Sequence, residues 1–352
     1  MSRIIATSTA VPPHAIPQPV ARRFALDHFR DSGLDLERLA AVFDHAGIDT
    51  RYSCMPPEWF GNGRDFGESN AVYIDWATRL GEQVARDCLT QTGLTPTDLD
   101  HIIFVSTTGL ATPSIDARLA NVLGLRGNIR RTPLWGLGCA GGASGLAHAY
   151  RAALADPTAR VLLVAVELCS LTFKSDDYSK SNFVATALFA DGAAGVLVVG
   201  DDVASDASGP TITAAASTTW PDSLDVMGWN FDSAGMQVVF SRSIPKLVRD
   251  KARTNIETFL NDNALTLDDL AAFIVHPGGT KVMDAYQEAL PLPDAYYDGA
   301  RTVLRDYGNM SSPTVLFVLD RTLRENTPNP GTNALVTALG PGFSAENVLL
   351  RF

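Results

Sequence analysis

The sequence has little charge and few cysteines. Only 19% of its 352 residues are Asp, Glu, Lys or Arg, whereas a typical soluble domain has about 25%. The four cysteines are Cys54, Cys88, Cys139 and Cys169, and no two have the CxxC spacing of a metal or redox motif. We therefore expect free thiols, as in a reducing cytoplasmic compartment, and no bound metal.

Basic runs and long apolar runs are also missing. The 39 acidic residues outnumber the 28 basic ones, and the net charge is −11. This balance argues against nucleic acid or an anionic membrane surface as a partner. Uncharged apolar runs stay shorter than the roughly 18 residues of a membrane helix. Pro12 and Pro13 interrupt the apolar stretch near the start, so neither a targeting segment nor integral membrane association is expected.

What the sequence does contain is an alternation of short apolar runs with amphipathic stretches. Apolar residues at 77, 80, 84 and 88, and again at 248, 252, 256 and 259, have helical spacing. The alternation predicts an α/β fold with helix-covered sheets. The predicted strands are His101–Thr107, Arg160–Glu167, Ala194–Gly200, Ala271–His276 and Asn333–Leu339.

The chain also resembles itself. "GLTPTDLDHIIFV" from Gly93 aligns with "ALTLDDLAAFIVH" from Ala264 at a shift of 171 positions, from 93 to 264. The same shift aligns Gly138 and Cys139 with Asn309 and Met310. We predict two related halves, residues 1–205 and 206–352, whose equivalent helix starts meet at the middle of the molecule.

The stretch "LWGLGCAGGASGLAHAY" (134–150) places Cys139 in a glycine-rich turn before a predicted helix. A helix N-terminus and a nearby imidazole both favour thiolate, so we expect the pKa of Cys139 to lie below about 8.5. The flanking glycines are expected to let a substrate approach the backbone. The alternative is a small buried cysteine without a catalytic role.

His276 and Asn309 are the other candidates. His276 ends a predicted strand in "VHPGG", where an α/β protein often has a crevice, although a structural histidine is the alternative. Asn309 precedes a predicted helix in "YGNMSSP", as a donor to a developing oxyanion or as a plain N-cap. Together with Cys139, these residue types suit nucleophilic catalysis followed by enolate stabilisation.

Five motifs in order resemble the type III polyketide synthases of the chalcone synthase superfamily. The resemblance implies a thiolase-type five-layered αβαβα fold made of two related halves, and a homodimer. The motifs are "GCAGGASGL" at Cys139, "ALFADGAAGVLVVG" at Ala187, "VHPGG" at His276, "YGNMSSPTVLFVLD" at Asn309 and "ALGPGFSAENVLL" near the end.

The resemblance also implies a mechanism. Cys139 would accept an acyl group from an acyl-CoA starter, while His276 and Asn309 would decarboxylate malonyl-CoA and stabilise the enolate. No cofactor is implied, because the coenzyme A thioesters are substrates. Residues expected to bind coenzyme A are Arg51, Lys281, Gly278 and Gly279.

Departures from the plant enzymes narrow the expectation. Phe189 keeps the first of two gating phenylalanines, Val238 replaces the second, and Thr112 and Cys169 replace a methionine and a threonine. This set resembles bacterial alkylpyrone and alkylresorcinol synthases, which use long-chain acyl starters. Residues expected to contact substrate are Phe189, Val238, Cys169, Thr107, Thr172, Ser311, Gly340, Pro341 and Gly342.

Three other functions stay open at this point. A ketoacyl synthase III also uses Cys, His and Asn, but for a single condensation. A cysteine hydrolase can use the same three residue types. The third alternative is an inactive interaction subunit with the same fold.

Overall fold

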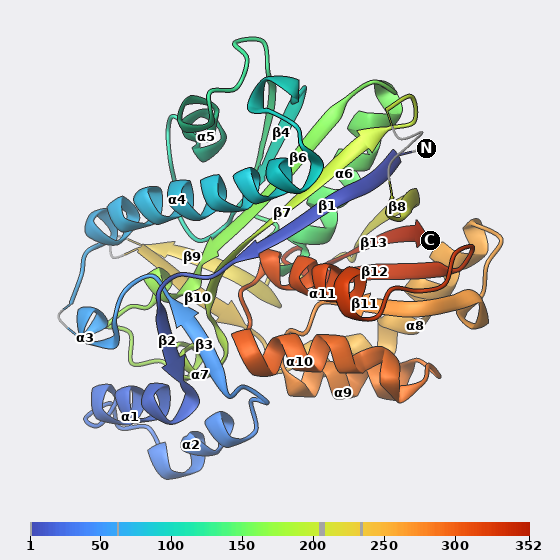
Figure 1. Cartoon of the computed structure of the whole chain (residues 1–352). Helices are drawn as coiled ribbons and strands as arrows, with labels where there is room; N and C mark the ends of the chain where they lie inside the picture. The colour runs from blue at the N-terminus through green and yellow to red at the C-terminus, as the bar shows by residue number, and fades with distance from the viewer. Residues whose placement is uncertain (1, 62, 204–207, 233–234) are drawn as a thin grey trace.

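The computed structural model describes residues 2–61, 63–203, 208–232 and 235–352 (Figure 1). Helices and strands alternate along most of the chain, as expected from the sequence. The boundary predicted between residues 205 and 206 lies outside the described residues. The longer helices are α1 (Gln18–His28), α2 (Leu36–Asp44), α4 (Phe66–Thr92), α5 (Ile115–Leu123), α6 (Gly141–Ala155), α7 (Lys180–Leu188), α8 (Ile244–Asp262), α9 (Thr280–Ala289), α10 (Asp298–Tyr307) and α11 (Ser312–Glu325).

The strands predicted from apolar runs are confirmed to within a few residues. Besides the longer helices, the chain forms six short helical turns in its described part: α3 (Pro57–Phe60), η1 (Pro96–Asp98), η2 (Gly138–Ala140), η3 (Cys169–Thr172), η4 (Leu267–Asp269) and η5 (Asp294–Tyr297). The strands are β1 (Ser2–Ala10), β2 (His14–Pro17), β3 (Thr50–Ser53), β4 (His101–Val105), β5 (Arg130–Leu134), β6 (Arg160–Leu168), β7 (Asp191–Gly200), β8 (Thr211–Thr219), β9 (Met227–Asp232), β10 (Gly235–Phe240), β11 (Leu270–Val275), β12 (Asn333–Gly340) and β13 (Ser344–Arg351).

The central sheet has two halves, which are joined where β1 pairs with β8. Among the described residues, nine strands are hydrogen-bonded in the order β11-β12-β13-β8-β1-β7-β6-β4-β5. Strand β1 pairs with β7 along its length, but with β8 only at Ser2 and Arg3. The halves are therefore joined at one end and diverge from there, which leaves room between them for helices (Figure 1).

Helices α6 and α11 fill that space. Helix α6 contacts β4 and β6 of the first half and also β12 and β13 of the second, and α11 packs against α6. Helices α4 and α5 cover the outer face of the first half, and α8 packs its apolar side chains on the outer face of the second. The result is the thiolase-type five-layered αβαβα arrangement that the sequence resemblance implies.

The internal repeat recurs in the structure at the same shift. Helix α6 begins at Gly141 and α11 at Ser312, 171 positions later (141 to 312). The turns η1 and η4 keep this shift too, and each begins with a Thr-to-Asp capping box. Equivalent local sequences thus form equivalent elements in the two halves.

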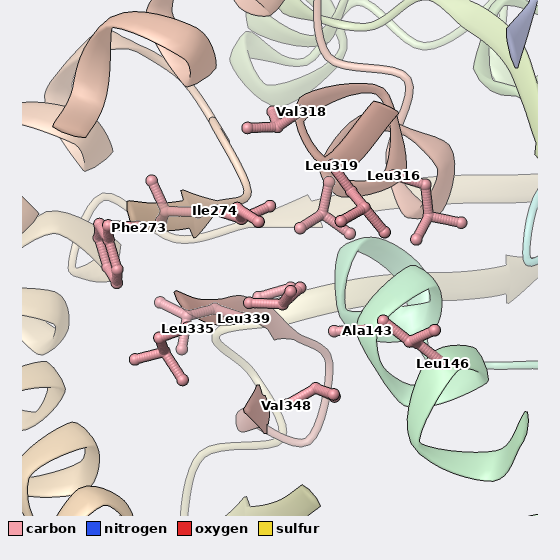
Figure 2. Close-up of a cluster of buried hydrophobic side chains, with 14 of the residues drawn as sticks. Ala143, Leu146, Phe273, Ile274, Leu316, Val318, Leu319, Leu335, Leu339 and Val348 are labelled. Carbon is pink, nitrogen blue, oxygen red and sulfur yellow. The ribbon is translucent and has the colours of Figure 1, made fainter. Parts of the chain in front are cut away.

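The glycines after Cys139 permit close packing of α6, whereas from the sequence they were expected to admit substrate to the backbone. A Cβ on Gly142 would lie 2.2 Å from the carbonyl oxygen of Ser312, and one on Gly145 would lie 2.6 Å from Leu163. Figure 2 shows the neighbouring part of this contact, with Leu316 of α11 facing Ala143 and Leu146 of α6. These glycines allow α6 to approach α11 and the sheet closely, rather than opening the backbone to a substrate.

The remaining elements surround the carboxyl ends of the central strands. The antiparallel pair β9–β10 contacts α7, and the antiparallel pair β2–β3 contacts β7 and α10. Helices α1, α2 and α7 pack together beside these two strand pairs (Figure 1). No helix in the described part of the chain is long and apolar enough to cross a membrane.

Candidate active site

Cys139 lies in the turn η2, directly before α6, and only 6% of its surface is exposed. Gly138 has a φ of +47°, and a Cβ there would lie 2.8 Å from Pro341. The N–H of Gly138 donates to the Thr107 hydroxyl at 3.0 Å. The turn that carries the thiol is therefore fixed from both sides.

His276 and Asn309 converge on the same point. His276 follows β11, and Asn309 lies between α10 and α11. The Sγ of Cys139 lies 4.0 Å from the side-chain oxygen of Asn309. Cys139, His276 and Asn309 line one small cavity. The sequence-based expectation that these three side chains meet is thus matched by the structure.

Burial keeps both titratable groups of this trio neutral. Burial raises the pKa of Cys139 to about 11, and the charge of Glu167 adds to the increase, while hydrogen bonds with Ser311 and Asn309 oppose it. Burial lowers the pKa of His276 to about 3. The expected low pKa of Cys139 is therefore wrong for the substrate-free site, because burial outweighs the helix N-terminus.

The hydrogen-bonding capacity of the trio is only partly used. Neither ring nitrogen of His276 has a partner among the described residues. The amide oxygen of Asn309 accepts from the N–H of Ser311 at 2.8 Å, and its nitrogen donates to the carbonyl of Gly278 at 3.1 Å. An amide nitrogen carries two protons, so one N–H of Asn309 and a neutral imidazole can both face a substrate.

A larger cavity lies beside the small one. Phe189, Val238, Cys169 and Thr172, all expected to contact substrate, line it. The ring of Phe189 packs edge-on against the ring of Phe240, with 6.2 Å between the ring centroids, and Phe240 lines the small cavity. An aromatic pair therefore stands between the two cavities.

Phe240 is a residue that sequence reasoning missed. It follows Val238 by two positions on β10, and alternate residues of a strand point to the same side. The phenylalanine missing at position 238 is thus partly replaced by Phe240, and the period of the strand was the available signal.

Glu167 is a second missed residue. It is fully buried at the end of the apolar strand β6, and burial raises the pKa of its carboxyl to about 7. It accepts hydrogen bonds from the N–H of Thr107 at 2.9 Å, from Thr108, and from the hydroxyl of Ser312 at 2.8 Å. Glu167 thus fixes the Thr107 loop and ties it to the start of α11.

The sequence matches two successive domains of one family. Residues 1–202 match the N-terminal domain of chalcone and stilbene synthases, and residues 211–352 match the C-terminal domain. The chain belongs to the chalcone and stilbene synthase family. It is a type III polyketide synthase, an enzyme class that condenses malonyl-CoA with loss of carbon dioxide. The hydrolase and inactive-subunit alternatives are thereby removed.

Bacterial type III polyketide synthases are among its relatives. A Bacillus subtilis (strain 168) protein, provisionally named a chalcone synthase, is 40% identical over 361 residues, covering 100% of this chain and 99% of its own. A 1,3,6,8-tetrahydroxynaphthalene synthase of Streptomyces peucetius subsp. caesius is 39% identical, covering 99% and 93%. The crystal structure of the Streptomyces coelicolor A3(2) enzyme of that name superposes with a TM-score of 0.94 at 28% identity, covering 99% of both chains.

The last glycine-rich loop of this polyketide synthase packs against the turn before Cys139. A Cβ on Gly340 would lie 2.5 Å from the carbonyl oxygen of Leu137, and Pro341 contacts Gly138. Gly342 has a φ of +136°. These residues were expected to contact substrate, and the structure places the loop against the turn that carries Cys139.

The residues expected at a coenzyme A rim fall into two groups. Lys281 is exposed near the start of α9, and Gly278 and Gly279 lead into that helix from His276. Arg51 instead is only 5% exposed, and it donates to main-chain carbonyls of α7. Arg51 was expected to bind coenzyme A, but β3 buries its side chain beneath α7, away from an exposed rim.

Proposed function

We propose that this type III polyketide synthase transfers an acyl group from acyl-CoA to Cys139 and extends it repeatedly with malonyl-CoA. The Cys139 sulfur bonds to the acyl carbon, the bond to coenzyme A breaks, and His276 passes the thiol proton to the departing sulfur. No metal or organic cofactor is needed in this scheme, because the two steps use only the thiol, the imidazole and an amide.

Chain extension uses His276 and Asn309 as hydrogen-bond donors. The carboxylate of malonyl-CoA leaves as carbon dioxide, and its bonding electrons form the enolate of acetyl-CoA. Donors from His276 and Asn309 hold the enolate oxygen. The enolate carbon then attacks the thioester, the Cys139 thiolate departs, and the chain is two carbons longer.

We further propose a long-chain fatty acyl starter and an alkylpyrone or alkylresorcinol product. The observation that carries this proposal is the apolar lining of the larger cavity, which includes Ile16, Ala21, Phe24, Phe60 and Phe173. Each buried methylene contributes about 0.8 kcal/mol, so roughly six more methylenes favour a long chain by up to about 5 kcal/mol before ordering costs.

A second candidate product is 1,3,6,8-tetrahydroxynaphthalene, which has no alkyl tail. The relative of that name at 39% identity favours it. A starter panel with malonyl-CoA, analysed by mass spectrometry, separates the two candidates. Lauroyl- and palmitoyl-CoA should be used with at least tenfold higher kcat/KM than acetyl-CoA, whereas tetrahydroxynaphthalene from malonyl-CoA alone would favour the second candidate.

Two substitutions test whether the acyl chain lies in the larger cavity. Cys169 is close enough to Cys139 for a Cys139 thiolate to raise the pKa of Cys169, whereas Ala21 lies on α1. Cys169→Phe should abolish use of lauroyl- and palmitoyl-CoA while acetyl-CoA remains usable. Ala21→Phe should lose palmitoyl-CoA alone. Arg23→Phe adds the same ring on the exposed side of α1 and should keep the wild-type preference. Wild-type starter ratios in both cavity variants would contradict the proposal.

A homodimer and a cytoplasmic location complete the proposed function. Both follow from the family resemblance and from the free cysteines rather than from an observed partner chain. Sedimentation of the purified protein tests the dimer, and fractionation of producing cells tests the location.

A further inference from the structure

Arg51 is a buried cation whose hydrogen-bond partners are all neutral. Its guanidinium donates to the carbonyl oxygens of Ala187 at 2.9 Å and Phe189 at 3.3 Å. It also donates to the carbonyl oxygen of Thr186 and to the side-chain oxygen of Gln18. A buried charge normally requires a partner of opposite sign or several hydrogen bonds, and here the hydrogen bonds take that place.

The main-chain acceptors are the last carbonyls of α7. That helix ends at Leu188, and carbonyls at a helix C-terminus lack partners within the helix and carry its negative end. Burial lowers the pKa of Arg51 to about 9, so the guanidinium stays protonated near neutral pH. Arg51 therefore caps α7 and fixes the chain direction into Phe189.

The capped segment holds the backbone of Asn309. The N–H of Asn309 donates to the carbonyl of Leu188, and its carbonyl accepts from the N–H of Ala190, both at 2.9 Å. Gly308, the residue before Asn309, has a φ of +72°. A Cβ on Gly308 would come within 3.3 Å of Arg51 and 3.1 Å of Ala190. Leu188 and Ala190, on either side of Phe189, thus hydrogen-bond the backbone of Asn309, and Arg51 anchors this end of α7.

We propose that Arg51 is a positioning residue that sets, through the end of α7, both the Phe189 ring between the two cavities and the Asn309 amide at the malonyl site. This inference rests on the role proposed above for Asn309. A lysine cannot replace it, because one ammonium cannot meet four acceptors arranged around a planar guanidinium.

The test separates starter loading from malonyl decarboxylation. Loading of hexanoyl-CoA on Cys139 is followed by intact-protein mass, and decarboxylation by carbon dioxide released from malonyl-CoA. Arg51→Lys should load within about threefold of the wild-type rate. Decarboxylation should fall on the order of 10- to 100-fold, since a displacement of about 1 Å has that effect on a positioned group.

Control variants separate positioning from stability. Arg126→Lys alters an arginine that also bonds a carbonyl, that of Leu99 at 2.8 Å, at the far end of β4. It should lower the melting temperature without changing the ratio of decarboxylation to loading. Asn309→Ala tests the proposed function separately: normal decarboxylation there would refute the role of Asn309 and not the anchoring by Arg51.

Two further variants keep the inference testable if Arg51→Lys does not fold. Gln18→Met removes one acceptor of Arg51 and should lower the decarboxylation ratio in the same direction by a smaller factor. Arg51→Ala should regain decarboxylation when free guanidinium is added, with loading unaffected. Variants that only melt earlier, with a wild-type ratio and no guanidinium effect, would make Arg51 merely structural and overturn the inference.

Discussion

The thiol and the imidazole of the active site are both uncharged at neutral pH. The pKa of Cys139 is raised to about 11 and that of His276 is lowered to about 3, in each case chiefly by burial. A thiolate and imidazolium pair is therefore not the resting state. The loading step proposed above then requires proton transfer from Cys139 as the thioester is attacked, and the imidazole of His276 is the base that we propose for it.

Alkylation of Cys139 should follow this raised pKa. Iodoacetamide reacts with thiolate, so its rate with Cys139 should be slow at pH 7 and should rise up to about pH 11. Cys139 should still react before the other cysteines, because burial raises the pKa of Cys88 to about 12, that of Cys54 further, and that of Cys169 well above its usual value. Peptide mass mapping across pH measures this, with starter CoA as protecting ligand. A plateau below pH 8.5 would contradict the prediction.

At the scale of elements, the contact between α6 and α11 positions the site. Each helix begins just after one of the proposed catalytic residues, Cys139 or Asn309, so the distance between the helices sets the distance between those two side chains. Gly142 and Gly145 make the close approach possible. We therefore expect helix packing to be coupled to catalysis.

A methyl group at Gly142 tests this coupling. It would lie 2.2 Å from the carbonyl oxygen of Ser312 and 2.8 Å from Val315, so α6 must move. Overpacking of this kind costs about 1–3 kcal/mol. Gly142→Ala should therefore lower the free energy of unfolding by that amount and should also lower kcat. Gly127→Ala is the matched control, because its Cβ would meet nothing within 4 Å. Urea unfolding and product formation measure both effects, and an active Gly142→Ala protein of wild-type stability would disprove the coupling.

At the scale of the whole molecule, patterns along the chain were enough to predict the repeat, an α/β fold with helix-covered sheets and the meeting of Cys139 with Asn309, whereas the five-layered arrangement was implied by the family resemblance. The rest depends on contacts between distant segments. From the sequence, Arg51 is expected at an exposed coenzyme A rim. In the fold, β3 packs under α7, and the Arg51 side chain donates to the carbonyl of Thr186, 135 positions away in the chain. Likewise, the partners of Glu167 come from two other loops, one of them in the second half. Burial of this kind decides pKa values, and it cannot be read from neighbouring residues.

The two halves should fold as one unit. Their shared core joins Ile4, Ile103 and Leu146 of the first half to Leu316 and Val348 of the second, so separation would expose the faces of α6 and α11. The intact chain should therefore unfold in one transition, with coincident midpoints by circular dichroism and by tryptophan fluorescence. Fragments 1–203 and 208–352, produced separately, should lack the near-ultraviolet dichroism of fixed side chains. Mixing the two during refolding should restore that signal together with malonyl-CoA decarboxylation, because each half completes the layer that the other needs. A fragment that unfolds cooperatively by itself would show that the halves are independent domains, and the central helix layer would then be an interface rather than a common core.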